Sequence, residues 1–501
     1  MRAPLVALAW IASATAGFAA DATLPARTPP VLTPVGIFSS PASDAAGARA
    51  IEDAYAAYFS RAAIDKGLIV VEPDGDGYKV TWRLQPAIEA GGSPPGALEI
   101  GEFSYHLKAE ANGGWSWASD AFPRIAFDSK SDKGPSKGVF EPEGFALSGH
   151  FDPTAEPFLV NKLTLSGLKG DVTETDPTGV NHIQFEEQDL SAETRAQSNA
   201  AGGVDVGTVH AVGKLSQTVT PPGGEPGGDA DVKVLASGSA GGAAISGLRA
   251  TEIGALWRAL VAGANAGKAP DGLAELVTAA LPLWNDLGAD VRLQEVSVGS
   301  AAGSAGLSSF GEKIKISGLS DEGRLEFGLD VDSLKLDSPM APAWASQLNP
   351  LSLKLAVALT DRGVGEAARL ALKDPKFGQS GDLSPETQAA INQAIKAGDP
   401  KILLLPGRLT TPILDLAFEG SARVDATTPS ATFKISADSL DKTLALATEL
   451  GQSSPDLQSG VLALSLVKGL ARTGADGRLE WDVVIEGDKV TVNGSPLPTG
   501  K

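Results

Sequence analysis

Apolar and polar residues alternate with a period of two over a long central part of the chain. The pattern runs from Leu68 to about residue 245, as in Tyr78, Val80 and Trp82, and turn-rich spacers separate the segments. Alternation of this kind is typical of strands that bury one face in a core. The pattern therefore predicts an antiparallel sheet over this region.

Helical periodicity appears on both sides of that region. Ser43 or Asp44 is placed to cap an amphipathic helix that ends at Lys66-Gly67, where glycine permits a left-handed turn. Later segments carry apolar stripes that need a surface to lie on, and the nearest one is a sheet face. We therefore predict an α+β fold: an extended, curved, mostly antiparallel sheet with amphipathic helices packed on one side.

One order of landmarks occurs twice, in residues 244–318 and 434–494. Each passage has an Ile-Ser strand end, two helical stripes separated by Pro-Asp, a Gly-Ala-Asp turn and a final apolar strand. That strand ends in Ser317-Gly318 in the first passage and Asn493-Gly494 in the second. The shared order predicts an internal duplication of a strand, two helices and a hairpin. After Asn493-Gly494 we expect a short tail that folds back and blocks the sheet edge.

The N-terminus resembles an export signal. Met1-Arg2 is followed by an apolar run to Phe18 and by small residues around Ala19, which predicts cleavage after Ala19 and a periplasmic location. An uncleaved anchor is the alternative, although the run is shorter than the ~20 residues of a membrane span. No stable span is expected after cleavage. The predicted organisation is a signal peptide (1–19), a Pro-rich linker (20–42), a first β-rich half (43–310) and a second half (311–501).

Composition narrows the classes of function. The net charge is −20, and Lys and Arg are scattered, so the chain has no electrostatic footprint for nucleic acid. Because it contains no Cys, disulfides, thiol catalysis and Cys-ligated metal are excluded. High contents of Gly (58) and Pro (33) favour many turns and short strands.

Motifs for catalysis or cofactor binding are weak. Neither a G-x-S-x-G elbow nor a phosphate-binding P-loop occurs. Gly363–Ala368 fits G-x-G-x-x-A, but the surrounding order is not βαβ, which favours a plain strand-to-helix turn. Asp74–Gly77 is interpreted as a hairpin turn rather than a calcium loop. The four histidines lack the spacing of a metal site. We expect no cofactor, no metal and no catalytic residue.

Two kinds of residue remain as site candidates. Trp115 and Trp117 share one face of a predicted strand, where they form either a platform for a sugar or acyl chain or part of the core. The acid pairs Glu186-Glu187 and Asp330 with Asp332 form a glycosidase dyad only if folding brings them together. For Asp330 and Asp332, alternation favours an ordinary solvated face.

The passage "LALSLVKGLARTGADGRLEWDVVIEGDKVTVNGSPL" resembles the ending of the YdgA-like group of uncharacterised Gram-negative envelope proteins, and of a related alphaproteobacterial family of unknown function. Those families end in a helix, a hairpin and an apolar-x-apolar-Asn-Gly sequence. The resemblance implies a periplasmic, β-rich, repetitive protein. It implies no catalytic residues, so no active site is carried over.

Two functions follow as hypotheses. The first is a non-enzymatic cell-envelope protein that holds or chaperones a hydrophobic partner, either a lipid or an envelope protein. The alternative is a carboxylate-dependent hydrolase of envelope polysaccharide. A cleft with two carboxyl groups about 5 to 9 Å apart would favour the hydrolase, and a continuous apolar surface would favour the binding protein.

Overall fold

The computed structural model describes residues 43–497 except 91–95, 132–133, 178, 267–269, 321–322, 340, 375, 378–381, 424–429, 439 and 452–454. The predicted signal peptide and linker lie outside the described residues. Two compact units result: unit 1 runs to Val291 and includes Leu372–Ser384, and unit 2 contains Arg292–Ala371 and the chain from Pro385 onward. Their boundary lies inside strand β15 (Asp286–Ser300), whereas the sequence suggested residue 310.

Unit 1 begins with two short helices in place of the single predicted one. The carboxylate of Asp44 caps α2 (Ala45–Phe59) by accepting hydrogen bonds from the Ala46 and Gly47 amides. Ser60 leaves the helical region with a φ of 79°, and α3 (Arg61–Asp65) follows it. The apolar side of α2 packs on the hairpin of β1 (Ile69–Asp74) and β2 (Gly77–Trp82).

A long hairpin organises the rest of unit 1. Strands β9 (Leu159–Asp176) and β10 (Gly179–Ser198) pair along their length, with an irregularity at Asp189, whose φ is 54°. On one side of Asp189 they continue into β8 (Ala146–Phe151) and β11 (Val204–Val212). On the other they continue into β7 (Gly134–Glu143) and β12 (Lys214–Thr220). Two sheet branches therefore share one hairpin.

The remaining elements of unit 1 extend these branches. They are α4 (Gln85–Ala90), β3 (Leu98–Ile100), β4 (Phe103–Ala109), β5 (Trp115–Ser119), β6 (Ile125–Ser131), β13 (Val232–Ala236), β14 (Gly238–Leu248), α5 (Ala250–Ala266) and α6 (Leu273–Ala280). Strands β1, β2, β4, β5, β8 and β9 pair in this order, each antiparallel to the next. Helix α2 covers the part of this sheet that contains Trp115.

Unit 2 is an antiparallel meander in which each main strand pairs with the next one along the chain. The strands are β16 (Gly303–Ser317), β17 (Gly323–Asp337), β18 (Leu351–Asp361), β19 (Lys401–Thr411), β20 (Leu414–Arg423), β21 (Ser430–Ala437), β23 (Leu479–Glu486), β24 (Lys489–Val492) and β25 (Ser495–Pro496). The short β22 (Arg472–Thr473) adds to β23.

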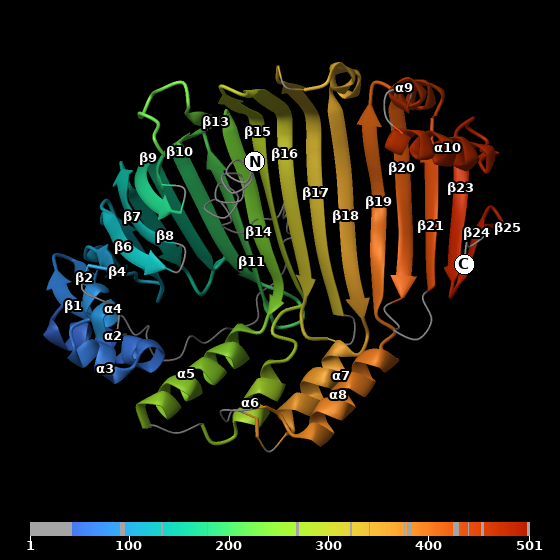
Figure 1. The fold of residues 1–501 in the computed structure, drawn as a ribbon. Coiled ribbons are helices and arrows are strands. Elements are labelled where there is room, and N and C mark those ends of the chain that lie inside the picture. Colours follow the sequence, from blue (N-terminus) through green and yellow to red (C-terminus); the bar gives the residue numbers. More distant parts are fainter. Residues whose placement is uncertain are drawn as a thin grey trace. The chain divides into compact units, whose positions relative to one another are not determined.

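The helices of unit 2 connect strands at their ends. They are the 3₁₀ turn η1 (Ala343–Leu348), α7 (Val364–Leu372), α8 (Pro385–Ala397), α9 (Asp441–Gly451) and α10 (Pro455–Gly469). In Figure 1, α7 and α8 lie beyond one end of β18 and β19, and α9 and α10 lie at the opposite end of the sheet.

The predicted α+β class with a mostly antiparallel sheet is confirmed. Packing of all the helices on one side of the sheet stays a prediction; α2 and α10 do pack on strands, at the clusters around Trp115 and Trp481. Helix α5 packs on α6, and α9 packs on α10. Part of the apolar surface of these helices is therefore covered by a neighbouring helix.

The two passages with matching sequence landmarks have the same order of elements: strand, helix, helix, strand, strand. It holds for β14-α5-α6-β15-β16 and for β21-α9-α10-β23-β24, apart from the two-residue β22. The order also recurs in β18-α7-α8-β19-β20. Common descent of these passages stays a prediction.

Asn493-Gly494 makes the hairpin turn that its sequence predicts. The φ angles of Asn493 and Gly494 are 50° and 78°, and Val492 pairs with Ser495 across them. The Asn493 side chain accepts a hydrogen bond from the Asp482 amide (2.8 Å) and donates to the carbonyls of Leu470 (2.8 Å) and Glu480 (3.0 Å). This one residue thus joins the end of α10 to strand β23.

We expect Asn493→Ala to lower the free energy of unfolding of the protein by about 2–3 kcal/mol. The loss combines about 1 kcal/mol for alanine in a left-handed backbone conformation with the loss of a partner by three half-buried carbonyl and amide groups. Chemical denaturation followed by circular dichroism measures it. Asn493→Gly is the matched variant, because it keeps the backbone conformation and removes only the amide. Equal stabilities for Asn493→Ala and the wild type would contradict the assigned bonds.

Candidate functional site

Trp115 and Trp117 lie on the same face of β5 but differ in surroundings. Trp115 is 3% exposed and belongs to the core beneath α2, so it has no surface for a ligand and takes the core-filling alternative. Trp117 lies over Gly149, where an added Cβ would be 1.9 Å from the ring. Its indole N–H donates to Asn161 Oδ1 at 3.2 Å. Ligand binding by Trp117 stays a prediction.

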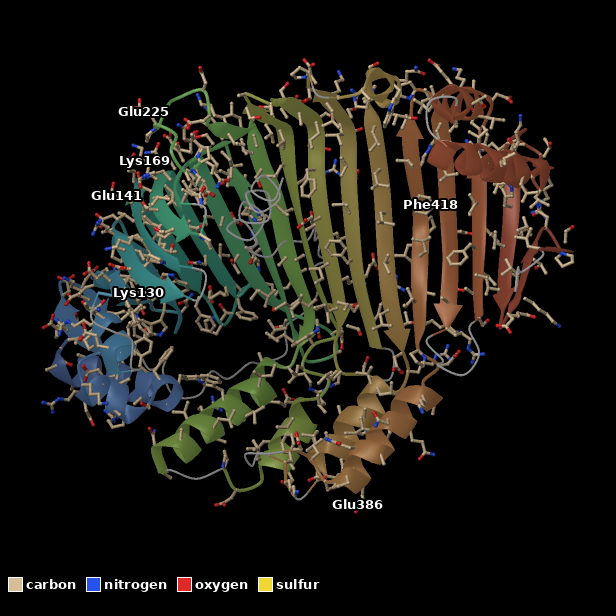
Figure 2. The ribbon with its side chains drawn as sticks, viewed as in Figure 1. Lys130, Glu141, Lys169, Glu225, Glu386 and Phe418 are labelled. Carbon is tan, nitrogen blue, oxygen red and sulfur yellow. The ribbon has the colours of Figure 1, made fainter. Side chains whose placement is uncertain are left out.

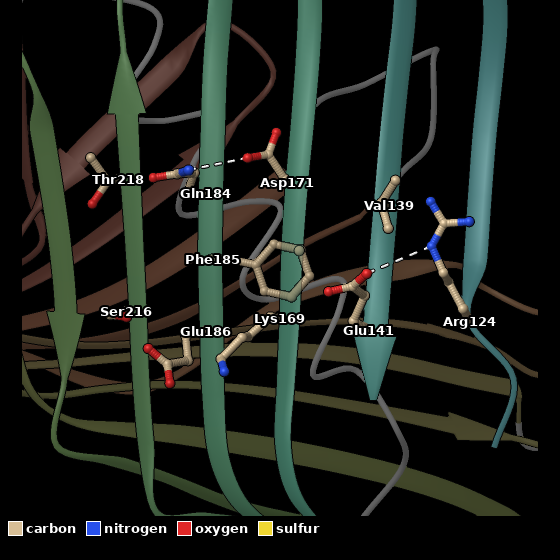
Figure 3. Close-up of a pocket in the computed structure, with 11 residues that line it drawn as sticks. Arg124, Val139, Glu141, Lys169, Asp171, Gln184, Phe185, Glu186, Ser216 and Thr218 are labelled. Atoms are coloured by element: carbon tan, nitrogen blue, oxygen red, sulfur yellow. Dashed lines mark hydrogen bonds and ion pairs between the residues drawn. The ribbon is translucent and has the colours of Figure 1, made fainter. Parts of the chain in front are cut away.

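A hollow of about 550 Å³ lies on the polar face of β7, β9, β10 and β12 (Figure 3). Its carboxylates all have partners: Glu141 pairs with Arg124 at 3.6 Å, and Asp171 accepts from the Gln184 amide at 3.1 Å. Glu186 accepts from the Gln188 side chain at 3.0 Å. Cross-strand pairs of this kind are ordinary on a solvated sheet face.

The acid pairs singled out in the sequence are either split between two faces or held by other partners. Glu186 and Glu187 point to opposite faces of β10, so one lines the polar hollow and the other is buried between Leu168 and Leu215. Asp332 accepts hydrogen bonds from Ser308 and Ser352, each at 2.9 Å, and these hydroxyls lower its pKa. Asp330 pairs with Arg292 at 2.8 Å.

Burial of Glu187 makes stability depend on pH. The side chain is 7% exposed, and desolvation raises its pKa above the ordinary 4.5. Because the folded-state pKa is the higher one, stability is full below the unfolded-state pKa and falls as the pH rises through the folded-state pKa. We expect Glu187→Gln to be more stable than the wild type at neutral pH and equal to it in acid. Denaturant titrations at several pH values test this, with Glu186→Gln as the solvated control.

The strongest candidate for a functional surface is an apolar face of the unit 2 sheet. Two cross-strand rows contain only apolar residues or glycine on the eight main strands from β16 to β24, β22 excepted. The first row is Ile314, Phe327, Val357, Leu404, Gly420, Phe433, Val483 and Val492, and the second is Ile316, Leu325, Leu359, Ile402, Ala422, Ala431, Ile485 and Val490. We call these two rows the apolar face.

Side chains at the centre of the apolar face are open to solvent. Leu325, Leu359 and Ile402 stand directly opposite one another on three adjacent strands, and each is 44% exposed. Phe327 in the next row is 50% exposed and Val357 is 36% exposed. An isolated exposed leucine is common on a protein surface, but a contiguous exposed patch marks a binding surface.

On β17 and β18, two neighbours of these residues on the opposite face are more buried. Glu326, between Leu325 and Phe327, has a side chain only 12% exposed, and it pairs with Arg324 at 2.8 Å and Lys313 at 3.7 Å. Ala358, the neighbour of Glu326 on β18, is completely buried. The long stems of charged residues can cover such a surface. At this point of the sheet, the apolar residues are therefore more exposed than their neighbours on the opposite face.

Aromatic rings pack over several glycines on the neighbouring strands. An added Cβ at Gly420 would lie 2.4 Å from the Phe433 ring, and one at Gly407 would lie 2.3 Å from the ring of Phe418 on β20, labelled in Figure 2. The face ends at a cluster around Trp481, which is 4% exposed and packs with Leu464 of α10. The open part of the apolar face therefore lies toward β17, β18 and β19.

The described residues contain no group of three or more His, Asp and Glu side chains placed to hold a metal ion. None of the helices in the described ranges is long and apolar enough to cross a membrane. Comparisons with known proteins assign no family: no protein-family model matches the chain, and no curated protein or solved structure matches it.

The exposed apolar face was not predicted from the sequence, although the alternation that produces it is present there. Alternation in stretches such as "KIKIS" and "RLEFGLDV" predicts one apolar face for each of these strands. The period does not tell whether a helix covers that face. Tertiary packing decides this: α10 covers the cluster around Trp481 and leaves Leu325, Leu359 and Ile402 exposed.

Proposed function

We propose that this chain is a non-enzymatic cell-envelope protein that binds the acyl chains of lipids on the apolar face of unit 2. The observation that carries the proposal is the row of Leu325, Leu359 and Ile402, in which directly paired aliphatic residues on three strands are each 44% exposed. Covering such a surface gains about 25 cal/mol for each Å² removed from water.

The chemistry of the face favours a lipid over a protein partner. Protein interfaces concentrate Trp, Tyr and Arg at their centre and carry a hydrogen bond for every 100–200 Å² or so. The two rows offer aliphatic side chains, two phenylalanines and no polar side chain. An acyl chain needs no hydrogen bonds, so it matches this surface without leaving polar groups unpaired. An envelope protein is the less favoured partner.

The periplasmic location is part of the same proposal. It is supported by the signal-like N-terminus, the net charge of −20 and the resemblance to YdgA-like envelope proteins. Curvature of the sheet and duplication of its strand-helix-helix-hairpin passages belong to the proposal as well, since repeated units would lengthen the two rows. The polysaccharide hydrolase gains no support, because both acid pairs proposed for it are separated or engaged.

Native mass spectrometry of the protein purified from its own periplasm tests the binding function. We expect adducts with the masses of phospholipids that disappear after extraction with organic solvent. The extracted protein is expected to take up a fluorescent phosphatidylcholine again. Protein that is free of lipid as purified and also fails to take up this probe would contradict the proposed function.

A further inference from the structure

Helix α10 carries apolar residues on two opposite sides. Leu464 packs inward against the Trp481 cluster. Leu462 and Leu466, four residues apart and so on one side of the helix, are 73% and 61% exposed, and the adjoining Val467 is 43% exposed. No other large hydrophobic residue in the described part of the chain is as exposed as these two leucines.

Next to Leu466, the described polar side chains of α10 have partners of their own. Ser465 lies beside Leu466, and its hydroxyl donates to the Val461 carbonyl at 2.8 Å, inside the helix. Lys468 is bonded to Asp441 of α9. The stretch from Leu457 to Val467 contains no charged residue at all. Entry into hydrocarbon requires polar groups to be satisfied internally, and the Ser465 hydroxyl meets this requirement.

Two hydrogen bonds hold α10 to the strands that carry the apolar face. The Trp481 indole N–H donates to the Val467 carbonyl at 2.7 Å, and the Asn493 amide donates to the Leu470 carbonyl at 2.8 Å. Trp481 pairs across the strands with Ile435, on the side that also carries Val483 and Phe433. The exposed leucines are therefore attached to the end of the lipid-binding surface.

We propose that α10 docks the protein on a lipid bilayer, with Leu462 and Leu466 inserted in the hydrocarbon. With 15 residues the helix is shorter than the ~20 of a span, so it lies in the interface plane. A protein partner or a second copy would meet few polar groups with which to bond. The net charge of −20 disfavours anionic lipid, so neutral lipid is the expected surface. The inference rests on the proposed function, because a bilayer is the natural source of the acyl chains.

Flotation of the full chain with phosphatidylcholine vesicles tests the docking. We expect the wild type to float with the vesicles equally at low and high salt. Leu462→Gln combined with Leu466→Gln should lower the partition coefficient at least about tenfold, since two buried leucine side chains are lost from the hydrocarbon. The matched control combines Val209→Gln with Leu235→Gln, at residues of unit 1 that are 54% and 44% exposed, and it should float like the wild type.

Uptake of fluorescent phosphatidylcholine without vesicles separates this inference from the proposed function. We expect the Leu462/Leu466 variant to take up the probe normally, which also shows that it folds. A wild type that does not float, or a variant that floats as well as the wild type, overturns the docking. Dimers that dissociate in the variant, without flotation of the wild type, overturn it in favour of a second copy. Flotation that depends on α10 without probe uptake refutes lipid binding by the sheet alone.

Discussion

Leu359→Asp is expected to lower the affinity of the protein for fluorescent phosphatidylcholine about a hundredfold. Leu359 stands at the centre of its row, between Leu325 and Ile402, and is 44% exposed. An acyl chain laid across this row would have to remove a carboxylate from water, which costs a few kcal/mol, and 2.7 kcal/mol corresponds to about a hundredfold in affinity. A fluorescence titration with the extracted protein measures the change.

Thr360→Asp is the matched control for that substitution. Thr360 is the next residue on β18 and points to the opposite face, where it lies between Arg324 and Lys401 on the neighbouring strands. The variant adds the same charge to the same strand, so it should bind the probe like the wild type. If both variants lost binding equally, general electrostatics would explain the loss and the apolar face would not be the site.

Gly170→Val is expected to destabilise unit 1 by about 2–4 kcal/mol. An added Cβ at Gly170 would lie 1.9 Å from the ring of Phe185 on the paired strand, and that ring is also 5.5 Å from the ring of Phe140. The valine must displace Phe185 from its packed position, which strains the core and exposes aromatic surface. Urea denaturation followed by circular dichroism gives the change in the free energy of unfolding.

Gly299→Val is the control for the strand effect of valine. Gly299 also lies inside a strand, β15, but an added Cβ meets no atom within 4 Å there. Because valine favours strands, this variant should be as stable as the wild type or slightly more stable. A loss at Gly299 as large as that at Gly170 would show that the ring of Phe185 is not the cause.

Local chemistry made several elements predictable from the sequence. Asn493-Gly494 predicted a turn with two positive φ angles, because those residue types tolerate left-handed backbone best. Asp74–Gly77 likewise predicted the hairpin of β1 and β2. The separation of Glu186 from Glu187 was also available, since adjacent residues of any strand point to opposite faces. Hydrophobic periodicity and the turn preferences of residues depend on a few neighbouring positions, so they can be read directly from the sequence.

Packing between elements that are distant in the chain explains what the sequence did not predict. Trp115 and Trp117 have identical signals, yet α2 covers the first and leaves the second half-buried on Gly149. Helix α10 has apolar residues on its inner side and on its outer side, so hydrophobic periodicity does not predict that Leu462 faces solvent. The break at Ser60 depends on the backbone of one residue in an otherwise helical pattern.

The meander order of unit 2 determines how the sheet can gain or lose strands in evolution. Each main strand from β16 to β25 pairs with its neighbours in the chain, so no distant segment is threaded between them. Insertion or deletion of a whole hairpin keeps every other pairing and changes the width of the sheet by about 10 Å. Relatives of different lengths should therefore differ by whole pairs of strands, which under the proposed function would change the area available to lipid.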